Sequence, residues 1–522
     1  MRIAVIGAGP AGLTAAKQAL ARGHSVAIFE KHADIGGIWN PASGGAYQSV
    51  RMQTSAQCFP FSDYAPSSIS EFPNVAEVHT YLRGYSDYFN VSQHIRHGEE
   101  VTDVKKLFDK WVITSAHGTK GKTEQVDRVI IANGELWIPK VLPLLSERCG
   151  STKVISVKEY YNSELFIDKK ILIVGGGVSG ADIASELAES GCTVEWSVRS
   201  TALFLPRRCG DYNNDHLFSY IGRYATAKMP RADYLQILHK IMPEYMDAYK
   251  ETKIYPFKGH NNAIHINDRI VESVHQDRVR VRSAFWKMDN DGTVHFQDGT
   301  TDKYDVIISC AGYEKVDYSF IDNFDRTNLF EHFFYHPDTT LAILNTPGDA
   351  DAVGTACPYF ELIAGWILRV FEGVVRLPSP DLMRRWCERA EGRSNKRYFY
   401  DCWLESIRIG LLSQQIPDPM NEFDDYWTLI SSIPLSSNLQ LSGLRHYPAA
   451  YDHLIEMDSL KSRLLTSVPL ASRRKLFSTK KITEAEFSNA EITPSVNVIS
   501  LGLSVPSELI ETSEALVQIG SS

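Results

Sequence analysis

The stretch Ile3-Ala4-Val5-Ile6-Gly7-Ala8-Gly9-Pro10-Ala11-Gly12 decides the fold, and Ile171-Leu172-Ile173-Val174-Gly175-Gly176-Gly177-Val178-Ser179-Gly180 repeats its pattern. Each stretch has an apolar run typical of a buried strand, a turn with three spaced glycines, and the start of a helix. The glycines permit the tight turn, let the backbone approach a pyrophosphate and allow close helix–strand packing, while the helix N-terminus stabilises the anion. One such glycine motif is weak evidence, whereas two in this context predict two dinucleotides on one chain.

The residue that ends the second strand of each unit indicates which dinucleotide binds there. The strand predicted at 25–29 ends at Glu30, whose carboxylate accepts hydrogen bonds from ribose hydroxyls and repels a 2′-phosphate. The strand predicted at 193–198 ends at Arg199 and Ser200, which suit a 2′-phosphate because guanidinium pairs with phosphate bidentately. We therefore predict FAD at the first site and NADPH at the second. The alternative for Arg199 is a solvated charge at a strand end.

Composition limits the class of protein. The chain has 522 residues, of which 43% are hydrophobic, so it can form two or three domains with sizeable cores. A net charge of −9 argues against general nucleic-acid binding. The eight cysteines are scattered without a Cys-x-x-Cys pair, which argues against a disulfide reductase and fits a reducing compartment. No segment is long and apolar enough to span a bilayer, so we expect a cytoplasmic protein.

These patterns predict an α/β fold with two dinucleotide-binding Rossmann-like domains, the NADPH domain being inserted into the FAD domain. The strands predicted at 126–131 and 305–310 are interpreted as the hinges where the chain leaves and re-enters the FAD domain. Hydrophobic periodicity fades near the C-terminus, which predicts disorder there. The segments expected are the first part of the FAD domain over 1–150, the NADPH domain over 151–304 with a helical excursion over about 207–263, the second part of the FAD domain with a C-terminal helical region over 305–469, and a disordered tail over 470–522.

Taken together, the residues resemble the flavin-containing monooxygenases, which hold FAD and NADPH on a single chain. The resemblance covers about residues 1–450. Besides the two glycine motifs, Glu30, Arg199 and Ser200, it rests on Gly36-Gly37-Ile38-Trp39, the amphipathic helix predicted over 78–89, Ala181-Asp182-Ile183-Ala184, Ala311-Gly312-Tyr313, and Glu361-Leu362 before Trp366.

Several positions depart from the pattern of that family. Between the glycine motifs, family members usually carry a linker motif with a glycine and a histidine, where this chain has Thr152 and Ser156. Tyr160 fits the end of that linker motif. Val178 stands where the second glycine motif usually has asparagine. We therefore expect cofactor binding to be kept, and we expect any difference from the family in the protection of the oxygenated flavin.

Gln53 is the one candidate catalytic residue. Counting back from Phe61 and Asp63, it stands where many family members place an asparagine beside the flavin ring. The resemblance implies that its amide donates a hydrogen bond to the oxygenated flavin or to NADP⁺. The alternative is that Gln53 only satisfies backbone groups.

The candidate cofactor-binding residues come from the glycine motifs, the strand ends and the loops expected beside the flavin. They are Gly7, Ala8, Gly9, Pro10, Ala11, Gly12, Glu30, Gly37, Ile38, Trp39, Gln53, Thr54, Gly175, Gly177, Ser179, Gly180, Asp182, Arg199 and Ser200. We predict no metal site. His332 and His336 have a spacing that suits one helix face, but they flank three aromatic residues and precede Pro337, so we expect a packed aromatic segment.

The resemblance implies a monooxygenase that uses FAD, NADPH and O₂ to insert one oxygen atom into a small organic substrate at nitrogen or sulfur, through a C4a-hydroperoxyflavin, and that tailors natural products. Three alternatives stay open. A Baeyer–Villiger monooxygenase would typically end the linker motif with tryptophan rather than Tyr160. An NADPH oxidase would release peroxide because Gln53, Ser156 and Val178 fail to protect the adduct. A non-catalytic redox sensor would carry damaged glycine motifs, and both are intact.

Overall fold

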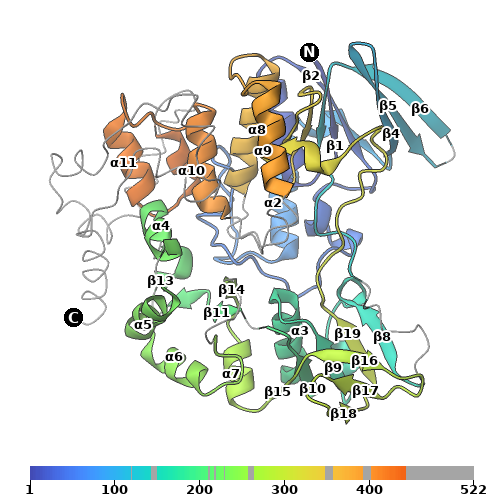
Figure 1. Ribbon diagram of the computed structural model, residues 1–522, viewed down its shortest axis with the longest axis vertical. Coiled ribbons are helices and arrows are strands. Elements are labelled where there is room, and N and C mark those ends of the chain that lie inside the picture. The colour runs from blue at the N-terminus through green and yellow to red at the C-terminus, as the bar shows by residue number, and fades with distance from the viewer. Residues whose placement is uncertain are drawn as a thin grey trace.

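The computed structural model describes residues 1–441, except for 119, 141, 143–149, 201, 210–211, 217–218, 229, 257–263, 347–356 and 392–400. The tail predicted over 470–522 lies outside the described residues, as does the end of the 305–469 segment. Figure 1 shows two sheets in separate halves of the molecule, with β1 and β2 in the upper half and β9, β10 and β19 in the lower half. Each sheet carries one glycine motif, and we call the two halves the first and second units.

The first unit contains a seven-stranded sheet in the order β20-β21-β22-β7-β1-β2-β3. Its central strands run parallel and are buried, as apolar runs without polar alternation predict. Helix α1 (Pro10–Ala21) follows β1 and packs against α8 (Cys357–Phe371). The strands are β1 (Arg2–Ile6), β2 (Ser25–Glu30), β3 (Ile95–His97), β7 (Arg128–Ile131), β20 (Leu329–Phe330), β21 (Phe334–Tyr335) and β22 (Leu341–Ile343).

The second unit contains a fully parallel five-stranded sheet in the order β15-β10-β9-β19-β8. Helix α3 (Val178–Glu189) follows β9 and packs beside α7 (Ile270–His275). The strands are β8 (Lys153–Ser156), β9 (Lys170–Val174), β10 (Thr193–Ser197), β15 (Val279–Arg282) and β19 (Val306–Ser309). The two parallel sheets, each with a helix after its glycine motif, confirm the predicted fold class of two Rossmann-like dinucleotide units.

One strand was assigned to the wrong sheet. We interpreted residues 305–310 as the re-entry into the FAD domain, but β19 pairs with β9 and β8 inside the second sheet. The boundary predicted at residue 304 therefore falls one strand too early. The reason is that β7 and β19 are both short buried apolar runs, and such a run has the same pattern in either parallel sheet. The other predicted boundaries stay predictions.

Two antiparallel sheets extend the units. Strands β4 (Glu100–Leu107), β5 (Lys110–His117) and β6 (Lys120–Val126) flank the first, and β16 (Phe285–Met288), β17 (Val294–Phe296) and β18 (Thr301–Asp302) flank the second. The predicted amphipathic helix is α2 (Val75–Tyr88). It begins three residues earlier than predicted, because Asn74 and Glu77 form a capping box.

The segment predicted as a helical excursion over about 207–263 is partly helical where the structure describes it, and its predicted boundaries stay predictions. It contains α4 (Tyr220–Lys228), α5 (Arg231–Ile241) and α6 (Pro243–Lys250). In Figure 1, α4 lies beside α10 and α11, which follow in the chain after the first unit. The excursion also holds β12 (Arg208–Cys209) and β13 (Tyr212–Asn213), and the paired strands β11 (Leu203–Leu205) and β14 (Ile264–Ile266) flank it. The later helices are α9 (Pro380–Glu391), α10 (Cys402–Leu412) and α11 (Phe423–Ser431).

Candidate functional site

The glycines of the first motif have two different roles: two of them allow close packing, and one leaves space for a ligand. A Cβ atom at Gly7 would lie 2.4 Å from the Ala132 carbonyl oxygen, and one at Gly12 would lie 1.9 Å from the Gly7 oxygen. These two positions serve the packing of the strand against the helix. At Gly9, the nearest atom to an added Cβ is the Gly37 Cα, 3.8 Å away. Gly9 stands at the N-terminus of α1, where unpaired backbone N–H groups attract an anion, so the open space fits a pyrophosphate.

The second glycine motif repeats this division. A Cβ atom at Gly175 would lie 2.2 Å from the Cys310 oxygen, and one at Gly180 would lie 2.1 Å from the Gly175 oxygen. At Gly177, which caps the N-terminus of α3, no described atom lies within 4 Å of an added Cβ. The same open position at the same place in both motifs fits a second pyrophosphate.

Glu30 ends β2 as predicted, and the fold holds its carboxylate in place. Its Oε2 accepts a hydrogen bond of 2.8 Å from the Ala8 N–H, and its Oε1 accepts one of 2.8 Å from the His32 N–H. Each carboxylate oxygen has a second lone pair, so both can still accept from a ribose. The Gly36 N–H donates to the Ala8 oxygen at 2.9 Å, which brings the predicted flavin-side loop Gly37–Trp39 against the glycine motif.

Arg199 and Ser200 follow β10, as predicted for a site that reads a 2′-phosphate. Arg199 is exposed, and among the described residues no carboxylate pairs with it. Ser200 lies against the second glycine motif, since a Cβ atom at Gly176 would lie 2.8 Å from its carbonyl oxygen. Arg199 is therefore exposed next to a residue that lies against the second glycine motif, and its reading of a 2′-phosphate stays a prediction.

Gln53 lies where the two units meet. Its Oε1 accepts a hydrogen bond of 3.4 Å from the Ile266 N–H in β14. Because one amide oxygen and one NH₂ group share the side chain, this contact leaves the NH₂ group to donate elsewhere. The neighbouring Thr54 is buried. Gln53 thus satisfies one backbone group and keeps its donor, and its role toward a cofactor stays a prediction.

Arg207 holds the backbone on the N-terminal side of Gln53. This buried residue donates from Nε to the Met52 oxygen at 2.9 Å and from Nη2 to the Arg51 oxygen at 3.3 Å, and it pairs with Asp268 at 2.6 Å. The sequence did not predict this role of Arg207, because nothing in its local pattern distinguishes it from a surface arginine.

Asp182 is a predicted cofactor-binding residue, and its described hydrogen bonds are with protein side chains. Its Oδ2 accepts a hydrogen bond of 2.8 Å from the Tyr47 hydroxyl, and its Oδ1 accepts one from the Asn267 side chain. Burial raises the pKa of Asp182. These two contacts join the two units, and the role of Asp182 toward NADPH stays a prediction.

The fold and these contacts are those of a known family. Residues 1–413 match the family model described as flavin-binding monooxygenase-like. The chain belongs to this family. It is 29% identical over 453 residues to flavin-containing monooxygenase 5 of Homo sapiens, with 81% of this chain and 82% of the relative covered. It is therefore a flavin-dependent monooxygenase, and its cofactors are the FAD and NADPH of that family.

Solved structures share the fold of this monooxygenase. The S-allyl-L-cysteine S-oxygenase of Allium sativum matches with a TM-score of 0.55 at 20% identity, covering 96% of this chain and 98% of that one. The open structure of a cyclohexanone monooxygenase matches with a TM-score of 0.58 at 16% identity, covering 78% and 96%. Among the described helices, none is long and apolar enough to cross a membrane.

The linker residues that depart from the family pattern make hydrogen bonds within the protein. The Thr152 hydroxyl donates to the Tyr304 oxygen at 2.8 Å. Ser156 forms a capping box with Glu159, where family members usually carry histidine. Tyr160 is buried and stacks on Phe166 with ring centroids 5.6 Å apart. Thr152 and Ser156 therefore stabilise the start of the second unit.

Proposed function

We propose that this monooxygenase transfers one oxygen atom from O₂ to a nitrogen or sulfur atom of a small organic substrate. NADPH supplies two electrons, one oxygen atom enters the substrate, and the other leaves as water. When bound, FAD supplies the redox chemistry that activates O₂, and the protein supplies binding, orientation and exclusion of water.

The position of Gln53 between the two units carries the proposal. The first unit would hold FAD along Gly9 and Glu30, and the second would hold NADPH along Gly177 and Arg199. Gln53 belongs to the first unit and is hydrogen-bonded to Ile266 in the second. Its NH₂ group can therefore donate to a reactive group placed between the two cofactors.

The choice of nitrogen or sulfur over a ketone rests on the linker motif. Tyr160 ends this motif, where Baeyer–Villiger enzymes typically have tryptophan. The solved structures do not decide the choice, because an S-oxygenase and a cyclohexanone monooxygenase share the fold almost equally well. A soft amine or thioether also needs no additional protein base to attack an electrophilic oxygen.

A substrate panel tests the proposal. The purified flavin-loaded protein receives NADPH, ¹⁸O₂ and one compound at a time: a tertiary amine, a thioether or a cyclic ketone. We expect an N-oxide or a sulfoxide carrying one ¹⁸O atom, formed in proportion to the NADPH consumed. Lactone as the dominant product would favour the Baeyer–Villiger alternative, and hydrogen peroxide without any oxygenated product would favour the oxidase.

A further inference from the structure

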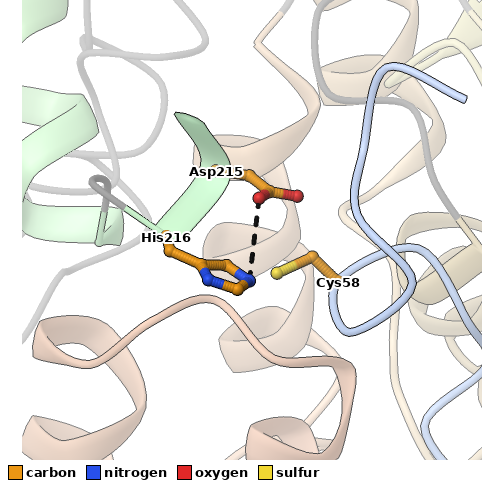
Figure 2. Close-up of side chains that lie close together, drawn as sticks. All are labelled: Cys58, Asp215 and His216. Carbon is orange, nitrogen blue, oxygen red and sulfur yellow. Dashed lines mark ion pairs between the residues drawn. The ribbon is translucent and has the colours of Figure 1, made fainter. Parts of the chain in front are cut away.

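Three side chains of different chemistry converge beside the Gln53 segment. Cys58 lies a few residues beyond Gln53, whereas Asp215 and His216 belong to a short 3-10 helix (Asn214–His216) in the second unit. Figure 2 shows the three side chains pointing toward one another. The Cys58 sulfur, a carboxylate oxygen of Asp215 and an imidazole nitrogen of His216 all lie within 4.8 Å of one another. Sequence reasoning predicted no such set.

The Asp215 carboxylate is oriented toward the centre of the cluster. Its Oδ2 accepts a hydrogen bond of 2.6 Å from the Ser55 N–H. Its Oδ1 is buried, makes no hydrogen bond of ordinary geometry among the described residues, and lies 3.8 Å from the His216 Nε2. The His216 Nε2 also lies 3.3 Å from the Ser55 hydroxyl oxygen, and the Cys58 thiol interacts with the Asp215 carboxylate. A buried carboxylate oxygen without an ordinary hydrogen bond is unfavourable, so this atom is suited to a cation.

We propose that Cys58, Asp215 and His216 bind a divalent metal ion of the zinc type. Thiolate sulfur, imidazole nitrogen and carboxylate oxygen are the ligand types that zinc takes in proteins, and three protein ligands leave a fourth position open for water. Zinc–ligand distances of about 2.0–2.3 Å place tetrahedral ligand atoms roughly 3.3–3.8 Å apart. The ligands therefore need to converge only slightly from their present separations.

The surroundings suit a metal site. Cys58 is 2% exposed and Asp215 is 4% exposed, so water competes little with these ligands. The His216 side chain is 14% exposed, which leaves a side from which an ion can enter. The Ser55 N–H holds the carboxylate by its other oxygen, which is the outer-shell contact that orients a metal ligand.

Zinc binding to the full-length, flavin-loaded protein tests the site. The protein is dialysed against a chelator, loaded with Zn²⁺ alone and passed through a desalting column, and its metal content is measured by mass spectrometry. We expect about one zinc ion per chain, with one sulfur ligand at about 2.3 Å in the zinc X-ray absorption spectrum. C58S and H216A should each weaken zinc binding by at least about a hundredfold, because loss of an outer-shell partner alone costs 10–100-fold.

Two matched variants serve as controls. C192S changes another buried cysteine, and H239A removes an exposed histidine that pairs with Asp247. Both should keep the zinc of the unmodified protein. Flavin content and the unfolding transition show whether each variant is folded, and C58S, the smaller change, decides the question if H216A does not fold. The proposal is overturned if the unmodified protein retains no zinc, or if C58S retains as much as C192S. Either outcome would leave a hydrogen-bonded cluster without a metal.

Discussion

The hydroxyl of Tyr47 donates a hydrogen bond of 2.8 Å to the carboxylate of Asp182, joining the segment after β2 to the helix after the second glycine motif. Both side chains are buried. Burial raises the pKa of Tyr47 well above its usual range, so the phenol stays protonated and keeps donating. A residue that we predicted from sequence to bind cofactor therefore connects the two units.

Tyr47→Phe should destabilise the protein by about 1–3 kcal/mol, because it leaves a buried carboxylate oxygen without a donor. Denaturant unfolding of the flavin-loaded protein measures this change. Tyr161→Phe is the control, since Tyr161 is 55% exposed and should tolerate the same change. Equal effects of the two variants would show that the Tyr47–Asp182 bond does not join the units.

Gly9→Ala should fold normally and lose FAD. An added methyl meets no protein atom closer than 3.8 Å, and Gly9 has an ordinary φ of −76°, so only the bound pyrophosphate would clash with it. Gly12→Ala should instead cost about 3 kcal/mol or more, because its methyl overlaps the Gly7 oxygen. Flavin absorbance and the unfolding transition separate the two effects.

Gly177→Ala is the matched control for that experiment. It should keep FAD and raise the Michaelis constant for NADPH, because the same open position occurs in the second motif. Full flavin occupancy in Gly9→Ala would contradict the assignment of the first site.

Arg199→Ala should raise the Michaelis constant for NADPH by roughly ten- to a hundredfold, because a charge-assisted hydrogen bond is worth about 1.5–3 kcal/mol. The constant for NADH should stay nearly unchanged, since NADH has no 2′-phosphate. Steady-state kinetics with both cofactors measure the difference. A parallel loss for NADH would mean that Arg199 acts in some way other than by reading the phosphate.

Gln53→Leu should raise the ratio of hydrogen peroxide to oxygenated product while flavin reduction by NADPH stays nearly normal. The variant removes the amide donor, which is worth about 1–3 kcal/mol in a site that excludes water. Gln53→Asn keeps the donor and should be milder. Product and peroxide are measured together at saturating NADPH and O₂, and an unchanged ratio in Gln53→Leu would refute the role.

Stability should depend on pH through Glu405 in α10. Burial is the main cause that raises the pKa of Glu405 to about 7; Arg408 lowers this pKa, and Glu331 and Asp401 contribute to raising it. A raised carboxyl pKa means that the folded state binds the proton more tightly than the unfolded state. The resulting stability is complete below the unfolded pKa and is lost as the pH rises through about 7; it amounts to at most about 3 kcal/mol.

Unfolding free energies measured between pH 5 and pH 8 check this dependence. We expect them to fall as the pH rises, and Glu405→Gln should flatten the trend because an amide does not titrate. Glu388→Gln is the control, since Glu388 lies on the surface of α9 and pairs with Arg384. A slope that survives in Glu405→Gln would assign the dependence to another group.

The sequence predicted what local patterns determine. Glycine spacing and apolar runs located β1, α1, β9 and α3, and the strand ends located Glu30 and Arg199. The sequence did not predict the sheet to which β19 belongs, because the pairing of a strand depends on residues far away in the chain. For the same reason it grouped neither Tyr47 with Asp182 nor Cys58 with His216, since each pair is far apart in the chain and neither member has a distinctive local motif.

The anchoring of the backbone around Gln53 also has a mechanical consequence. Residues 51–55 belong covalently to the first unit, yet Arg207, Ile266 and Asp215 of the second unit hold them by hydrogen bonds. If the two units rock against each other, these bonds must either break or move the Gln53 segment with the second unit. In the second case, the Gln53 amide beside the expected flavin would move together with the unit that is expected to hold NADPH.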